Sequence, residues 1–271
     1  MTHPISLAHL TVIDLPPPEM IRLAAGLGYD AVGLRLIRVT DTTPGYPLHL
    51  DAGLLRQTVR AVQDSGIKVQ DIEFVRMTPE FRGEDYAAFL DAGAALGARQ
   101  VICAPYDPDL SRLSHNLAAF HEAARRRGLS CVLEFFPWTN VPDLATALRV
   151  VEASGAPDLG VLVDTLHFNR SGSSLDDLSR LAPRRMPFLH LCDAPVCPPY
   201  TTEDLFHAGR AERLPPGEGE IDLTAILARL PADLPLSLEV PMTALSREKG
   251  PAEVAARVLA ATRRLLGQVA A

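Results

Sequence analysis

The sequence lacks the paired-cysteine patterns that stabilise small secreted domains. Its four cysteines, Cys103, Cys131, Cys192 and Cys197, form no C-x-x-C pair and have no spacing typical of a disulfide framework. Cys103 and Cys131 lie inside apolar segments that are typical of strands. We therefore expect buried, reduced thiols, as in a protein of the reducing cytoplasm.

Long hydrophobic runs and an excess of positive charge are also missing. No basic segment followed by an apolar one opens the chain, and no apolar run approaches about 18 residues, so neither an export signal nor a membrane span is expected. The formal net charge is −7, from 33 acidic and 26 basic residues, which disfavours a nucleic-acid partner. The sequence contains no Gly-x-Gly-x-x-Gly or P-loop motif to cradle phosphates.

What the chain does contain is an eightfold alternation of strand-like and helix-like segments. Short apolar runs, typical of buried parallel strands, occupy residues 5–10, 31–36, 68–74, 100–104, 130–135, 159–164, 187–192 and 236–240. Amphipathic segments lie near 18–27, 51–65, 84–96, 111–127, 141–154, 175–182, 222–230 and 251–267. This order predicts a single α/β domain over residues 1–271, a (β/α)₈ TIM barrel, a fold that takes about 250 residues.

The longest segment without a regular pattern is residues 194–221, which follows the seventh predicted strand. Long irregular loops in compact domains usually act as lids or binding loops. We expect this loop to lie on the same side of the barrel as the carboxyl ends of the strands, where the active sites of this fold lie.

Four predicted strands end in a residue type that binds metal ions. Glu134, Asp164, His190 and Glu239 follow the apolar runs of strands five to eight, and such strand ends converge on one mouth of the barrel. For any one of them alone, a structural ion pair or a solvated strand end is the better explanation. Together they predict a site for one divalent metal ion. Three carboxylates and one imidazole favour Mn²⁺ or Mg²⁺, with Co²⁺ and Zn²⁺ as alternatives.

Three further residues are candidates for substrate contact. Arg35 closes predicted strand two and Glu73 closes predicted strand three, so both face the same mouth. They either pair with each other or bind the substrate. Trp138, the only tryptophan, follows the first predicted ligand and either packs in a lid or stacks on the substrate.

Several of these motifs resemble one known family. The segments VDTLH (Asp164 to His167), HLCDA (around His190), RLPPGEGEID (Arg213 to Asp222) and LSLEV (ending beyond Glu239) are similar to those of the sugar phosphate isomerase/epimerase family. This family belongs to the xylose isomerase-like TIM barrel superfamily, and the resemblance spans essentially the whole chain in strand order.

The resemblance implies a function for each motif. It implies that the four strand-end residues hold the metal, that Glu134 and Glu239 also move the substrate proton, and that His167 and Arg213 contact substrate oxygens. It implies a small keto-sugar or cyclic hydroxy-ketone as the partner. Barrels of this family are often dimers or tetramers, so a homo-oligomer is compatible with it.

The chemistry of such a site starts from a weakly acidic proton next to a carbonyl. A metal ion that chelates the carbonyl and a neighbouring hydroxyl stabilises the enediolate, and carboxylates on opposite faces take and return the proton. Return of the proton gives an epimer or an aldose–ketose isomer, whereas loss of a β-hydroxyl gives a dehydratase. The leading prediction is an isomerase or epimerase of a keto-sugar, hydroxy-ketone or cyclitol.

Two other functions are alternatives. One is a lyase of the same superfamily, similar to 3-dehydroshikimate dehydratase, inosose dehydratase or an enzyme that eliminates from 3-keto-glycosides. The segment FFPWTN after Glu134 favours it, because ketose epimerases often carry an acidic residue there and aromatic residues suit a flatter substrate. The other is a non-catalytic sugar-binding or regulatory protein. The DNA-repair endonuclease branch is excluded, since its additional histidines are missing.

Overall fold

The computed structural model describes residues 3–39 and 44–269 of the chain, and its eight strands close into a barrel. The strands follow one another in sequence order, each parallel to its neighbours: β1 (Ile5–Leu7), β2 (Ala31–Arg35), β3 (Lys68–Met77), β4 (Gln100–Pro105), β5 (Ser130–Glu134), β6 (Gly160–Asp164), β7 (Leu189–Leu191) and β8 (Leu236–Leu238). Pairing of Ile5 with Leu236 and of Leu7 with Leu238 closes the ring. The prediction of a (β/α)₈ TIM barrel is confirmed.

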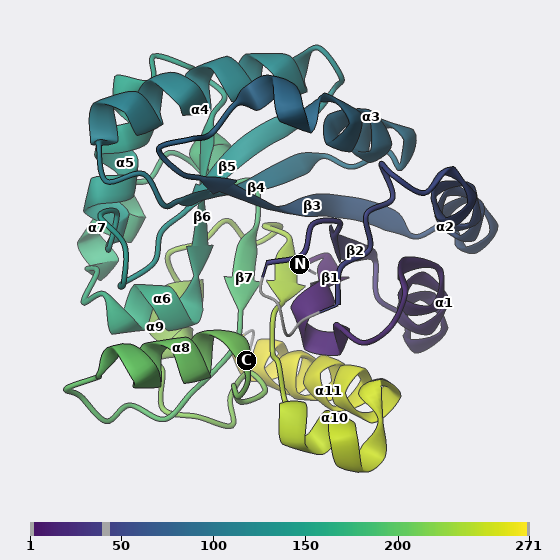
Figure 1. Cartoon of the computed structure of the whole chain (residues 1–271). Helices are drawn as coiled ribbons and strands as arrows, with labels where there is room; N and C mark the ends of the chain where they lie inside the picture. The colour runs from purple at the N-terminus through teal and green to yellow at the C-terminus, as the bar shows by residue number, and fades with distance from the viewer. Residues whose placement is uncertain (1–2, 40–43, 270–271) are drawn as a thin grey trace.

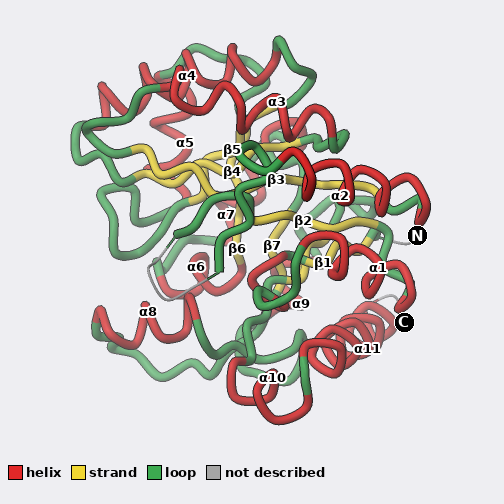
Figure 2. The backbone as a smooth tube through the Cα atoms, turned by 45° about the vertical axis from the view of Figure 1, so that its right-hand side comes forward, coloured by secondary structure: helices red, strands yellow, loops and turns green. Residues whose placement is uncertain are grey.

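Helices surround the strands on the outside (Figures 1 and 2). Eight of them correspond to the predicted amphipathic segments: α1 (Pro17–Leu27), α2 (Ala52–Ser65), α3 (Ala87–Ala95), α4 (Leu110–Arg125), α5 (Leu144–Ala153), α7 (Leu175–Arg180), α9 (Leu223–Leu227) and α11 (Pro251–Val269). Shorter helices are α6 (Thr165–Arg170), α8 (Thr202–Arg210) and α10 (Thr243–Lys249), with 3₁₀ turns at His9–Val12, Gly83–Tyr86 and Pro183–Arg185. No helix of the described residues is long and apolar enough to cross a membrane.

Local sequence explains where the helices begin and end. The carboxylates of Asp51, Asp109 and Asp143 accept backbone N–H groups at the starts of α2, α4 and α5. Gly28 ends α1 in the left-handed conformation, with φ of 85°, and its N–H donates to the carbonyls of Ala24 and Ala25. These capping residues set where each helix begins and ends. They therefore also set where the chain turns back towards the next strand.

Several predicted boundaries differ from the structure, and three errors bear on the site. The first strand ends at Leu7, because Thr11 Oγ1 donates to the Leu238 carbonyl and accepts the Val240 N–H and so fixes a 3₁₀ turn that begins at His9. The third strand continues to Met77, since its last residues pair with β4, and Glu73 therefore lies within the strand instead of closing it.

The third error concerns residues 194–221, which are not irregular throughout. Helix α8 occupies Thr202–Arg210 within this segment. A capping box starts the helix: the Thr201 side chain accepts the Asp204 N–H, and the Asp204 carboxylate accepts the Thr201 N–H. This reciprocal pair is what stabilises a helix in a segment otherwise rich in proline and glycine.

The apolar side chains form two separate clusters. The larger one fills the space between the strands and the outer helices and includes the buried, free thiols of Cys103 and Cys131. The smaller one lies on one side of the barrel interior and consists of Phe74, Ile102, Ala104, Val132, Phe136, Leu162 and Phe188. The larger cluster stabilises the fold, and the smaller one borders the site described below.

We expect Leu117→Ala to lower the free energy of unfolding by about 2–5 kcal/mol, because Leu117 on α4 is 0% exposed and its removal leaves a cavity. The same substitution at Leu50, which is 77% exposed, is the control and should change it by less than about 0.5 kcal/mol. Denaturant titration of both variants measures the difference. Equal losses at the two positions would contradict the assignment of the core.

Candidate metal centre

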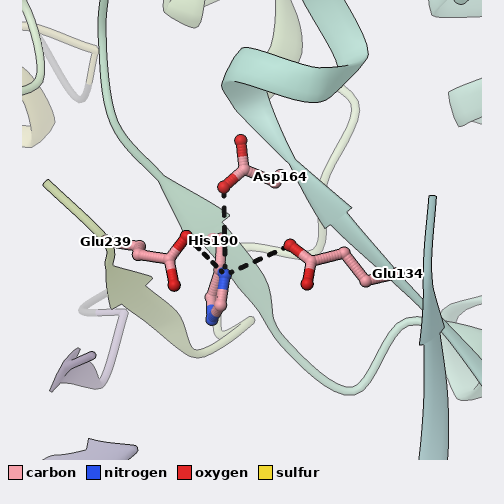
Figure 3. Close-up of side chains that lie close together, drawn as sticks. All are labelled: Glu134, Asp164, His190 and Glu239. Atoms are coloured by element: carbon pink, nitrogen blue, oxygen red, sulfur yellow. Dashed lines mark ion pairs between the residues drawn. The ribbon is translucent and has the colours of Figure 1, made fainter. Parts of the chain in front are cut away.

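The four predicted ligands lie together at one mouth of the barrel. Glu134 and Asp164 are the last residues of β5 and β6, His190 is the middle residue of β7, and Glu239 follows β8. One possible ligand atom of each residue lies within 4.8 Å of those of the others, and all four residues are buried. Figure 3 shows the Glu134 and Glu239 carboxylates on opposite sides of the His190 ring, with the Asp164 carboxylate between them.

The three carboxylates surround one nitrogen of the histidine. His190 Nδ1 lies 3.7 Å from Glu134 Oε1, 3.9 Å from Asp164 Oδ2 and 3.6 Å from Glu239 Oε2. It has no hydrogen-bond partner among the described residues. Ligands bound about 2.1 Å from one ion stand about 3–4 Å apart, so these spacings suit a shared cation. The donor set and the unpaired nitrogen together fit a divalent metal ion.

Arg213 borders this cluster. Its Nη1 donates to Asp164 Oδ2 at 2.7 Å and to the Glu239 carbonyl at 3.0 Å, and its Nη2 lies 3.0 Å from Glu239 Oε2. The guanidinium is buried. It therefore holds two candidate ligands in place, in addition to lining the cavity beside them.

Arg35 and Glu73 form an ion pair beside the cluster. Arg35 Nη2 lies 3.1 Å from Glu73 Oε2 and 3.9 Å from Glu239 Oε1, and both residues are buried. The sequence is compatible with two interpretations of Arg35 and Glu73, an ion pair between them and contact with the substrate. The structure contains the ion pair. Arg35 also lines the cavity, whereas Glu73 does not appear in its lining.

The site carries an excess of buried negative charge. The four carboxylates of Glu73, Glu134, Asp164 and Glu239 face only the two guanidinium groups, which leaves two negative charges. Burial of unpaired charge is costly. A divalent cation between the candidate ligands would neutralise this excess.

The pKa values of the cluster reflect this excess. Burial by itself would lower the pKa of His190, but the carboxylates of Glu239, Glu134 and Asp164 raise it to about 10. Burial raises the pKa of Glu134 to about 7, against the opposing effect of His190. Burial would also raise the pKa of Asp164, but the charge of Arg213, followed by the effects of the neighbouring His167 and His190, lowers it to about 2. Without a cation, protons on His190 and Glu134 therefore partly balance the charge.

An open cavity of about 330 Å³ adjoins the candidate ligands Glu134 and Glu239. One side of its wall is aromatic, formed by Phe74, Tyr106, Phe136, Trp138 and His167. The other side carries the guanidinium groups and the two glutamates. The lining of the cavity is therefore amphipathic, since it combines a group of aromatic rings with a group of charged side chains.

Trp138 and His167 form the centre of the aromatic side. The Trp138 ring stacks on Phe136 with centroids 5.1 Å apart, and its edge contacts His167 at 5.2 Å. Burial lowers the pKa of His167 to about 3, so its imidazole is neutral. Trp138 both packs against its neighbours and lines the cavity, so either interpretation of this residue is compatible with its position.

Asp193 fixes the loop that carries Arg213. Its carboxylate accepts the backbone N–H groups of Gly217, Gly219 and Ile221, each at 3.0 Å. A Cβ atom at Gly219 would overlap this carboxylate and would lie 2.7 Å from the backbone nitrogen of Ala194, so the close approach requires glycine. Asp193 therefore anchors the return of the chain from α8 to the barrel.

Other cavity residues were not among the predicted site residues. They are Leu10, Val39, Phe74, Tyr106, Phe136 and, at the end of α8, Gly209, Arg210 and Ala211. Tyr106 directly follows β4, so the strand-end reasoning applied to strands five to eight would have identified it. No comparable pattern pointed to Arg210, because it is the last residue of helix α8, and this helix was not predicted from the sequence.

Comparison with known proteins identifies the family. The model of the xylose isomerase-like TIM barrel family matches residues 21–264, and the chain belongs to this family. An inosose isomerase from Halalkalibacterium halodurans is 30% identical over 117 residues, which are 42% of this chain and 39% of that protein. The chain spans about half or less of the length of the curated relatives it matches.

Solved structures share the fold at lower identity. The crystal structure of the IOLI protein with a zinc atom superposes with a TM-score of 0.81 at 19% identity and covers 98% of both chains. A probable 3-DHS dehydratase from Bacillus anthracis superposes with a TM-score of 0.72 at 13% identity, covering 96% of this chain and 99% of that one. At these identities the likeness shows a shared fold.

We expect the apparent affinity for Zn²⁺ or Mn²⁺ to rise with pH between about pH 6 and 8. In this range His190, with a pKa of about 10, carries a proton that the ion must displace, and Glu134, with a pKa of about 7, loses a further fraction. Isothermal titration in buffers of different ionisation enthalpy should therefore detect about one to two protons released per ion. An affinity that is independent of pH would contradict these protonation states. The exposed His207 provides the control, since His207→Ala should leave the pH dependence unchanged.

Proposed function

We propose that the protein is a divalent-metal-dependent isomerase or epimerase of a small keto-sugar, hydroxy-ketone or cyclitol. The observation that carries this proposal is the position of Glu134 and Glu239. Both line the cavity, and they approach His190 Nδ1 from opposite sides, at 3.7 and 3.6 Å (Figure 3). Two carboxylates on opposite sides of one point suit a reaction that removes a proton and returns it elsewhere.

Glu134, Asp164, His190 and Glu239 would hold the ion. When bound, a divalent metal ion supplies Lewis-acid stabilisation of negative charge on the oxygens of a carbonyl substrate. The oxygen-rich donor set favours Mn²⁺ or Mg²⁺. Zn²⁺ is an alternative that gains support from the zinc atom in the IOLI protein, which shares this fold.

Glu134 and Glu239 would each carry out one part of the proton transfer. Glu134 lines the cavity at the end of β5, beside His190 Nδ1, and is therefore placed to exchange a proton with a substrate bound there. Glu239 is held on the other side of the centre by Arg213, at 3.0 Å. We assign the two carboxylates as base and acid for the carbon next to the substrate carbonyl, with no preference for which of them acts first.

The remaining polar groups would orient the substrate. His167, neutral because burial lowers its pKa to about 3, offers an imidazole to a substrate hydroxyl. Arg213 and Arg35 line the charged side of the cavity and present guanidinium groups to substrate oxygens. Trp138 provides an apolar surface for the ring carbons on the other side.

The relatives support this class of substrate. The matching curated relatives are named as inosose isomerases, and an inosose is a cyclic hydroxy-ketone. A six-membered polyol ring fits a small cavity with one charged and one apolar face. The chain matches only part of the length of these relatives, and their isomerase activity is assigned to it here as part of the proposal.

A lyase of the same family is the second candidate function. The aromatic side of the cavity, with Phe74, Tyr106, Phe136 and Trp138, favours a flat ring. One structure of the same fold is named as a probable 3-DHS dehydratase. In a lyase one carboxylate would take the α-proton in the same way, the β C–O bond would break, and the hydroxyl would leave as water after protonation by the other carboxyl group.

We expect Glu239→Gln to lower kcat by about 10²–10⁴-fold while KM changes little, because Gln cannot take or return a proton. The assay is exchange of the substrate α-proton in deuterated water, followed by NMR with metal-loaded protein and a panel of keto-sugars, cyclitols and 3-keto cyclic acids. The control is Glu248→Gln on α10, whose side chain is 67% exposed. Undiminished formation of product by the Glu239 variant would contradict the proposal.

The products of the same assay separate the two functions. An isomerase or epimerase is expected to incorporate solvent deuterium into isomeric products without new ultraviolet absorbance. A lyase would generate a conjugated enone, which absorbs strongly in the near ultraviolet. Absence of exchange with every substrate of the panel would favour a non-catalytic sugar-binding protein.

A further inference from the structure

The barrel interior beneath the candidate metal centre is apolar on one side and polar on the other. Strands β4 to β6 and the residue before β7 contribute the apolar side, with Ile102, Val132, Leu162 and Phe188. The opposite side is formed by β8, β1, β2 and β3. Its inward positions hold Ser237, Ser6, Gly33 and Asp71.

The alternation of the strands explains why these residues share the interior. Asp71 lies two residues before Glu73, and Ser237 two residues before Glu239, so each faces the same side of its strand as a residue of the centre. Ser6 is paired with Ser237 across β1 and β8. All three polar side chains are buried, with exposed fractions of 1% or less.

Four polar atoms in this region lack a protein partner. Ser6 Oγ, Ser237 Oγ, Asp71 Oδ2 and His190 Nε2 are all buried without a hydrogen bond to any described residue. A buried polar group without a partner is destabilising, and ordered water commonly satisfies such groups when two to four of them converge. Three of them belong to the adjacent strands β7, β8 and β1, and Asp71 on β3 reaches the same interior across Gly33 of β2, which has no side chain.

The orientation of His190 connects this region to the metal centre. Nδ1 faces the three carboxylates, and Nε2 points to the other side of the ring (Figure 3). His190 is also paired with Ser237 across β7 and β8. A histidine that binds a metal through Nδ1 keeps its proton on Nε2, and this N–H is normally donated to a carboxylate, a carbonyl or water.

Asp71 is fitted closely into this interior. A Cβ atom at Gly33 would lie 2.6 Å from Asp71 Oδ2 and 2.7 Å from Oδ1, so the glycine on β2 leaves room for the carboxyl group. Burial, followed by the charge of Glu73, raises the pKa of Asp71 to about 8. At neutral pH this carboxyl group is therefore mainly a neutral acid, which both donates and accepts hydrogen bonds and adds little charge to the centre.

We propose that Ser6, Ser237 and Asp71 form a buried water-binding pocket beneath the metal centre, and that Asp71 positions His190 through this water. The water accepts the Nε2–H of His190 and fixes the ring so that Nδ1 points at the ion. This inference rests on the proposed function, because it assigns Asp71 a role in holding the histidine ligand. Asp71 is a positioning residue and does not touch the substrate.

The test compares Asp71→Ala with Asp71→Asn. Alanine removes the hydrogen-bonding group and should lower the affinity for Zn²⁺ by about 10–100-fold in isothermal titration, whereas asparagine should retain an affinity near that of the unaltered protein. In ¹⁵N-histidine-labelled protein, the Nε2 resonance of His190 should shift in the alanine variant. A high-resolution crystal structure should show ordered water within hydrogen-bonding distance of Asp71, Ser237 and His190 Nε2.

The control is Ser114→Ala, which removes a buried hydrogen-bonding group on α4, bonded to the Val150 carbonyl, away from the barrel interior. It should leave the metal affinity unchanged. If Asp71→Ala does not fold, Ser237→Ala is expected to lower the affinity in the same way. Equal affinity of the folded alanine variant and the unaltered protein, or a water-free interior in the crystal structure, would overturn the inference alone. Failure of the unaltered protein to bind any ion would overturn the proposed function as well.

Discussion

The buried excess of negative charge at the mouth of the barrel is the constraint on which the other features depend. Three carboxylates converge on one imidazole, and a fourth lies beside them, in a region shielded from water. Such an arrangement persists only with compensating positive charge. Arg213 and Arg35 supply part of it, and the carboxylates raise the pKa of His190 so that its proton supplies a further part. The candidate function follows from this imbalance more directly than from the shape of the cavity.

Much of the fold and of the ligand set could be predicted because both depend on local patterns. Buried parallel strands are continuous apolar runs, so a charged residue that ends such a run stands out, as Glu134 and Glu239 do. Features that depend on contacts between distant segments could not be predicted. The continuation of β3 to Met77 needs pairing with β4, and the pairing of Arg213 with Asp164 needs the closed barrel. Helix α8 had a local signal, the capping box at Thr201 and Asp204, which was missed within a loop-like composition.

The lining of the cavity combines two kinds of recognition. Polar groups around the centre suit oxygens in fixed positions, whereas the rings of Trp138 and Phe136 suit the face of a ring with few hydroxyl groups. The relative weight of the two kinds of group would distinguish a polyol substrate from a flatter one. The two groups are in contact: Glu134 ends β5 two residues before Phe136, and the Arg35 guanidinium lies 5.9 Å from the centroid of the Phe74 ring. A substitution in either group therefore affects the other.

The origin of the four candidate ligands has a consequence for how this molecule varies. All four come from the second half of the barrel, on β5, β6 and β7 and directly after β8, whereas Arg35, Asp71 and Glu73 come from β2 and β3, in the first half of the barrel. The first half-barrel thus contributes charged and hydrogen-bonding surroundings to an ion whose direct contacts would belong to the second. Sequence changes confined to the first half would tune the strength and the protonation of the centre while its coordinating atoms stay the same.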